Sequence, residues 1–343
     1  MTASDDVGFH ARQHARWHLG EIIFWLLALA CAFLFPSRYL VMTDIVRLGL
    51  FAISIDLILG YAGIVSLGHA AFFGVGAYSA GLLSLHGVVT EPLLALILAG
   101  SAAMLLGFVT SFLVIRGVDL TRLMVTLGIA MLLEALAESF SNITGGTDGL
   151  QGIEMQPILG VFAFDMFGRT GFFYSLIVLF LLFLLARRIV HSPFGLSLRA
   201  IKNNPLRAAA IGIPVNRRLI AIYTVAAFYA GIAGALFTQT TALASLDVFA
   251  FERSADLLLV LIIGGTGYLY GGLIGAVVFR MLQEIFSTIT PQYWQFWIGA
   301  VLVVIVMVGR ARLHRWVLFL PNLLIAQVAG RKAAVAIPEG EGQ

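Results

Sequence analysis

The sequence predicts an all-α fold, a polytopic bundle of transmembrane helices. Hydrophobic residues make up 60% of the 343 residues and charged residues only 11%, whereas soluble domains carry about 25% charged residues. The apolar residues form continuous runs, while the membrane strands of outer-membrane barrels alternate over roughly ten residues. Charged residues gather between these runs, most clearly in a basic stretch from Arg187 to Arg218.

About ten helices fit this length, because a span and its connection take about 30 residues together. The apolar segments lie at 22–35, 42–60, 63–85, 92–115, 119–139, 171–187, 218–240, 255–266, 272–288 and 294–309. Eight spans is the alternative, since 255–288 is rich in glycine and is compatible with a re-entrant piece.

The first apolar segment follows a polar, basic start. A signal peptide has this outline, but no small-residue cleavage site follows Phe35. We therefore predict a first span with the N-terminus inside. Cys31, the single cysteine, lies in this segment, so an internal disulfide and a cysteine-based metal site are both excluded.

The loops differ in charge, and positive loops stay on the cytoplasmic side of a membrane. Loops 140–170 and 241–256 each carry three acidic residues against one basic residue, while the C-terminal segment carries five basic residues between 310 and 332. We predict a cytoplasmic segment 1–19, a membrane domain 20–310 with an external loop 140–170, and a cytoplasmic tail 311–343. Both ends then lie inside, which needs an even number of spans. The net charge of +3 lies on one side of this membrane protein, so nucleic acid is not an expected partner.

The basic stretch predicts a cytoplasmic loop, 188–217. From residue 187 to residue 218 the sequence has seven cations and no Asp or Glu. The cations are Arg187, Arg188, Arg199, Lys202, Arg207, Arg217 and Arg218. Asn204 suits a helix N-cap, Pro205 the first helical position and Gly212 the left-handed residue after a helix. A short helix at about Pro205–Ile211 is expected, with a second at 196–203. Helices this short are marginal in water, so we expect the loop to dock on a partner; a solvated loop that only sets the topology is the alternative.

Glycine-rich segments interrupt two apolar runs. The block from Gly60 to Gly81 contains six glycines, and Gly264-Gly-Thr-Gly267 resembles its start. Small residues allow close helix packing, and glycines also permit broken helices at which transporters often bind their solute. The candidate pathway residues are Asp56, Gly60, Gly63, Ser66 and His69. The alternatives are tight packing alone and, for His69, a hydrogen-bonded structural role.

Ionisable residues fall inside apolar segments, among them Arg47, Asp56, Glu134, Glu138, Arg280 and Glu284. Such residues are costly in a membrane and usually face the bundle interior. We interpret them as ion pairs between helices; a proton relay is the alternative.

Three blocks together resemble one family. They are GYAGIVSLGHAAFFGVGAYSA at 60–80, TGGTDGL at 144–150, and GLSLRAIKNNPLRAAAIGI at 195–213 with AAFYAGIAGAL at 226–236. They resemble ABC-importer permeases of the branched-chain amino acid type, the LivM-like subunit of the LivHM type. The resemblance runs over about 40–310 in the expected order. Asp56 stands where that family often carries Asn.

The resemblance implies a multi-pass permease subunit of the bacterial inner membrane that moves branched-chain or other neutral amino acids by alternating access. It implies three partners: a second, LivH-like permease, two cytoplasmic ABC ATPases that bind ATP and Mg, and a periplasmic amino-acid-binding protein. The chain lacks the phosphate loop Gly-x-x-x-x-Gly-Lys-[Ser/Thr], so it is not itself the ATPase. We expect no cofactor, metal or catalytic residue on it. Urea or short amides are alternative solutes, and a secondary transporter driven by an ion gradient is the rival class.

The resemblance also assigns roles to two loops. The residues expected to couple to the ATPase are Arg199, Lys202, Asn204, Pro205, Arg207 and Gly212. The residues expected to contact the binding protein are Thr144, Gly145, Gly146, Thr147 and Asp148. The other interpretation of this external loop is a flexible turn in which Asp148 caps a following helix.

Overall fold

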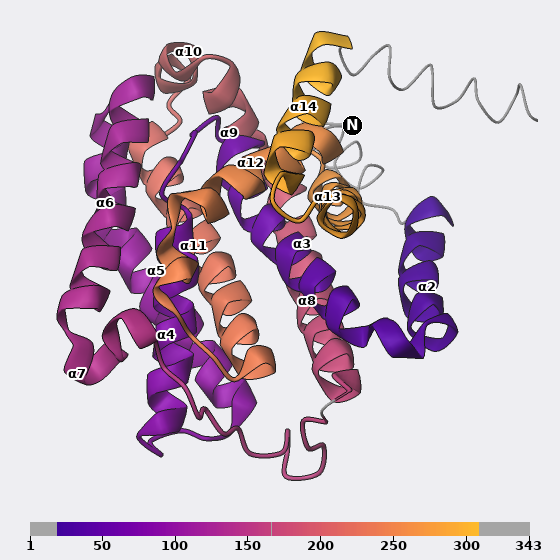
Figure 1. The fold of residues 1–343 in the computed structure, drawn as a ribbon. Coiled ribbons are helices and arrows are strands. Elements are labelled where there is room, and N and C mark those ends of the chain that lie inside the picture. The colour runs from indigo at the N-terminus through magenta and orange to yellow at the C-terminus, as the bar shows by residue number, and fades with distance from the viewer. Residues whose placement is uncertain (1–18, 166, 309–343) are drawn as a thin grey trace, which may run out of the picture. The chain divides into compact units, whose positions relative to one another are not determined.

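The computed structural model describes residues 19–165 and 167–308, which form helices and no named strand (Figure 1). The predicted segment 1–19, apart from its last residue, and the predicted tail 311–343 lie outside the described residues. The longer helices are α2 (Leu19–Leu34), α3 (Tyr39–Leu59), α4 (Ala70–Leu85), α5 (Pro92–Arg116), α6 (Asp119–Ser139), α8 (Arg169–Val190), α9 (Pro193–Asn203), α11 (Val215–Thr241), α12 (Phe251–Gly264), α13 (Leu269–Ile289) and α14 (Trp294–Val308). The short ones are η1 (Pro36–Arg38), α7 (Ser141–Thr144), η2 (Gly146–Asp148), α10 (Pro205–Ala210) and η3 (Leu246–Phe249).

Each predicted apolar segment contains one helix, so the all-helical class is confirmed. The largest error concerns the segment 63–85, because α4 begins only at Ala70. The preceding residues 60–69 are not helical. Ile64, Val65 and Leu67 make this stretch apolar enough to pass for the start of a helix, although its glycines end the helical path.

Within residues 19–165 and 167–308, five helices are each long and apolar enough to cross a membrane: α5, α6, α8, α11 and α13. A sixth crossing is counted if α2 and α3, which are bent by 96° at their junction, form one broken span. The 14 residues of α12 extend only about 21 Å, less than the ~30 Å hydrocarbon core of a bilayer. The number of spans and their orientation therefore remain predictions.

Helix α11 is the centre of the unit formed by residues 1–281, and it packs against α3, α4 and α5 (Figure 1). Small residues make this packing close. A Cβ on Gly234 would lie 1.9 Å from the Phe73 carbonyl oxygen, and one on Gly76 would lie 2.0 Å from the Gly231 carbonyl oxygen. Helix backbones in contact gain dispersion energy that lipid cannot replace, so these glycines hold the bundle together.

A partly buried network of ion pairs and hydrogen bonds joins α3 to α11 and α13. Asp44 pairs with Arg47 on its own helix and with Arg280 on α13, at 2.8 Å for the latter. Arg47 also donates to the Thr240 hydroxyl of α11 at 2.7 Å. The predicted ion pair between helices is confirmed for Arg280, whereas Arg47 pairs with Asp44 on its own helix. Their partner Asp44 was missed, because it lies one turn inside an apolar segment.

Candidate functional site

The break between α3 and α4 is a distinct piece of irregular backbone inside the bundle. Gly63 has a positive φ of 74°, and residues 64–68 run on without helical bonds. Neighbouring helices supply partners for backbone donors at its end: Leu67 donates to the Thr126 hydroxyl at 3.2 Å, and Ala70 donates to the Ser254 hydroxyl at 2.9 Å. Irregular backbone at membrane depth is tolerated only when its polar groups are satisfied in this way. Of the two interpretations of this block, a broken helix and tight packing alone, the irregular backbone at 60–69 agrees with the first.

Asp56 brings the two glycine-rich breaks together. Its side chain is fully buried, and its Oδ1 accepts a 2.7 Å hydrogen bond from the backbone N–H of Gly267. Gly60 lies directly against this contact, because a Cβ there would lie 2.1 Å from Asp56 Oδ1 and 2.5 Å from the Gly267 nitrogen. The two breaks that the sequence singled out, about 200 residues apart, thus meet at one carboxylate.

Ser66 and His69 are fully buried in this conformation. The His69 ring lies 5.8 Å from the Phe51 ring, and its Nε2 is 2.9 Å from the Ser54 hydroxyl. That hydroxyl donates to the Phe51 carbonyl, so Nε2 carries the proton and Nδ1 is left as an acceptor. Neither His69 Nδ1 nor the Ser66 hydroxyl has a hydrogen-bond partner in the described chain. His69 therefore has a structural hydrogen bond and an unused acceptor.

The loop 188–217, which is predicted to be cytoplasmic, contains the two expected short helices. Asn204 Oδ1 accepts from the backbone N–H of Arg207 at 2.9 Å and caps α10, as predicted. Gly212 has φ 87° and follows its last turn. Helix α9 starts at Pro193, three residues before the predicted start, because Ser192 caps it and Pro193 takes its first position. The sequence carried this signal, and it was missed.

Side chains of helix α9 contact the α3–α4 break, which is the first of the two glycine-rich breaks. The Lys202 ammonium donates to the Gly60 carbonyl oxygen at 2.6 Å. The Arg199 guanidinium lies 5.3 Å from the centre of the Tyr61 ring. At the start of the loop, Arg187 pairs with Glu21 of α2. Several cations of this loop therefore have partners inside the protein.

Helix α10 presents a different surface. Ala208 is its one buried residue among the described side chains, at 2% exposure. Leu206 is 84% exposed, and Ile211, just after the helix, is 71% exposed. Arg207 between them is also exposed. The result is a small apolar surface with a cation at its centre, at the end of the bundle opposite α7 (Figure 1).

The loop 140–170, which is predicted to be external, begins with a compact turn held by its glycines. Leu150 exchanges two backbone hydrogen bonds with Ala244, at 2.8 and 3.1 Å. A Cβ on Gly149 would lie 2.4 Å from the Ala244 carbonyl oxygen, so this position requires glycine. Gly146 is buried, Thr144 and Gly145 are half-buried, and Thr147 and Asp148 are exposed. The expected capping role of Asp148 is wrong, because no helix follows it within residues 149–165.

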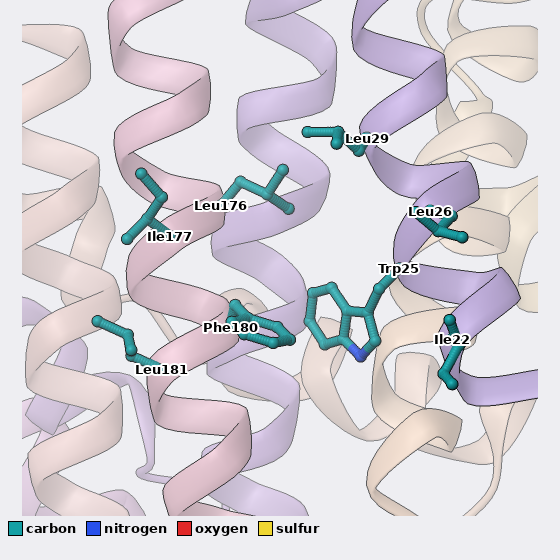
Figure 2. Close-up of a pocket in the computed structure, with 8 residues that line it drawn as sticks. All are labelled: Ile22, Trp25, Leu26, Leu29, Leu176, Ile177, Phe180 and Leu181. Atoms are coloured by element: carbon teal, nitrogen blue, oxygen red, sulfur yellow. The ribbon is translucent and has the colours of Figure 1, made fainter. Parts of the chain in front are cut away.

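A crevice between α2 and α8 has a volume of about 400 Å³. Figure 2 shows side chains of both helices around it. The lining residues are Ile22, Trp25, Leu26, Leu29, Leu176, Ile177, Phe180 and Leu181. These are hydrocarbon and aromatic side chains, and the Trp25 indole nitrogen is the one polar side-chain atom among them. It suits an acyl chain better than an amino acid.

Comparison with known families decides the class of the molecule. Residues 38–306 match the family model described as the permease component of the branched-chain amino acid transport system. The chain belongs to this family. The match spans both glycine-rich breaks, the turn at 144–150 and the basic loop 188–217, so these features are parts of a permease domain of a multi-pass membrane protein.

Several curated relatives agree. The high-affinity branched-chain amino acid permease LivM of Escherichia coli K12 is 26% identical over 282 residues, which cover 75% of this chain and 65% of LivM. A probable branched-chain amino acid permease LivH of Methanocaldococcus jannaschii is 28% identical, covering 62% and 68% of the two chains. The autoinducer 2 import permease LsrD of Escherichia coli is 27% identical, covering 80% and 83%. The chain thus spans about two thirds of the LivM that it matches. No solved structure matches the chain.

Proposed function

We propose that this chain is a permease subunit of an ATP-driven importer of neutral amino acids in a bacterial inner membrane. It works beside a second, related permease and alternates between outward and inward access. Two cytoplasmic ATPases bind ATP and Mg, and a periplasmic binding protein delivers the solute. Family membership and the similarity to LivM and LivH support this assignment.

The exposed face of α10 is the observation that carries the coupling part of the proposal. A helix of six residues is unstable alone in water, and it exposes Leu206 and Ile211 almost completely. A helix with apolar anchors and a central arginine fits a groove on another protein. We assign this groove to the ATPase, because α10 lies in the basic loop that the charge pattern places inside.

The solute is proposed to pass along the break between α3 and α4. Backbone groups at a broken helix bind a carboxylate or an ammonium without a buried counter-charge. His69 Nδ1 and the Ser66 hydroxyl are acceptors of the right kind for an ammonium N–H, and they have no partner in the described chain. They become available when the bundle opens. The similarity to LsrD makes sugar-like solutes the competing class.

The external turn is proposed to contact the binding protein. Thr147 and Asp148 stand exposed on a turn whose backbone is fixed by Gly145, Gly146 and Gly149. Exposed polar side chains on a rigid loop make good contact residues. The glycines set the conformation of the turn, and Thr147 and Asp148 provide the contacting side chains.

Uptake measurements test the proposal. Cells lacking the gene are complemented with it and supplied with labelled leucine, urea or ribose, with ATP maintained and the ion gradients dissipated by an ionophore. We expect leucine uptake that depends on the gene and continues without the gradient. Uptake that stops with the gradient while ATP is kept would identify a secondary transporter. Uptake of only urea or ribose would keep the importer and replace the solute.

A further inference from the structure

Three segments distant in the sequence meet near the end of α3. They are the α3–α4 break at Gly60, the last turn of α9 at Lys202 and the turn before α13 at Gly267. Lys202 donates to the Gly60 carbonyl at 2.6 Å, and Gly267 donates to Asp56 at 2.7 Å. One contact joins the cytoplasmic loop to the first break, and the other joins the first break to the second.

The two contacts differ in strength. Asp56 is fully buried, and a charged hydrogen bond away from water is costly to break. Lys202 is exposed, so water competes for its ammonium. Its position still favours the contact, since the last carbonyls of a helix lack partners and carry the negative end of the helix dipole. The Asp56 contact is therefore the stronger of the two, and the Lys202 contact is the one more open to competition from water.

These three segments are packed closely against one another. A Cβ on Gly60 would overlap both Asp56 Oδ1 and the Gly267 nitrogen, and one on Gly63 would lie 3.1 Å from the Lys202 side chain. Packed groups in such contact pass on a displacement because they cannot absorb it. A shift of α9 along its axis pushes or pulls Gly60, and the buried carboxylate carries the same shift to Gly267.

We infer that Lys202 and Asp56 are positioning residues that move both glycine-rich breaks together when α9 moves. This inference rests on the proposed function. Lys202 carries the motion from α9 to the first break, and Asp56 carries it to the second. Arg199 over the Tyr61 ring steadies α9 beside them. Neither residue has to touch the solute or the ATPase.

The test is the number of solute molecules imported per ATP hydrolysed by the complete importer in proteoliposomes. Lys202→Met should lower this ratio about fivefold, the effect expected of one exposed charged contact, while ATP hydrolysis continues. Lys202→Arg keeps a donor and should keep most of the ratio. Arg217→Met, which removes an exposed cation of the same loop, is the matched control and should change nothing.

Asp56 is tested by two variants. Asp56→Asn keeps the Oδ1 acceptor for Gly267 and should keep more of the ratio than Asp56→Ala, which should uncouple hydrolysis from import. Gel filtration checks that each variant still assembles; if Asp56→Ala does not, the Lys202 pair decides. An unchanged ratio in Lys202→Met would overturn the inference while the importer itself stands. A wild-type complex that imports no amino acid would instead overturn the proposed function and this inference with it.

Discussion

Helices α9 and α10 come from the same acid-free stretch and are joined by a single residue, Asn204, yet they make opposite kinds of contact. Helix α9 buries four residues and directs Lys202 towards the first break. Helix α10 buries only Ala208 and exposes Leu206 and Arg207. Helix α9 therefore packs as part of the bundle, whereas most of α10 is exposed.

The difference separates two roles that the charge pattern alone merges. An excess of Arg and Lys indicates which side of the membrane a loop occupies, but it does not indicate which cations have partners within the chain. We propose that α10 receives the ATPase and that α9 transmits its motion. The predictions below test this division.

The largest effect is expected when acidic residues replace the exposed apolar and basic residues of α10. The double variant Leu206→Asp, Arg207→Glu should reduce uptake in cells at least about tenfold, because buried charge and lost complementarity at an interface cost several kcal/mol. Leu196→Asp on α9 is the matched control, since Leu196 is also exposed, at 48%, and should be tolerated. Equal losses in both variants would remove the distinction between the helices.

A pair of glycines sharpens the role of α9. Gly63 and Gly87 both have positive φ, at 74° and 65°. An added Cβ would contact a side chain, that of Lys202, at Gly63, and would contact nothing at Gly87. Replacing either glycine by Ala should lower the stability of the folded protein by about 1–3 kcal/mol through backbone strain. Thermal unfolding of the purified complex measures this loss. Only Gly63→Ala should also lower uptake, because its Cβ displaces Lys202. If Gly87→Ala lowers uptake as much, strain alone explains the effect.

Sequence reasoning was strongest where the signal is local. Asn204, Pro205 and Gly212 mark the boundaries of α10, and the glycines of the 60–81 block indicate a break. It failed where the cause is distant in the chain: nothing near Asp56 indicates Gly267 as its partner, 211 residues away. Lys202 likewise looks like any other loop cation until the fold places it beside Gly60. Local propensity predicts elements, whereas the contacts that make a site depend on packing.

The smallest effect is expected from the two N-caps. Asn204→Ala and Ser192→Ala should each cost about 1 kcal/mol of local helix stability, with the Ser192 cap being the longer bond at 3.4 Å. Hydrogen exchange should then show loss of amide protection in α10 but not in α9, because buried residues such as Leu198 and Ile201 hold α9 in place. Similar loss in both would mean that α9 is no better anchored than α10.

The division of labour is tested most directly by measuring how much ATPase co-elutes with the permease pair when the α10 double variant and Lys202→Met are purified side by side. The account predicts that Leu206→Asp, Arg207→Glu loses the ATPase, while Lys202→Met keeps it in the wild-type proportion and loses only import. Loss of the ATPase from Lys202→Met, with retention by the α10 variant, would contradict it, because α9 would then be the docking helix.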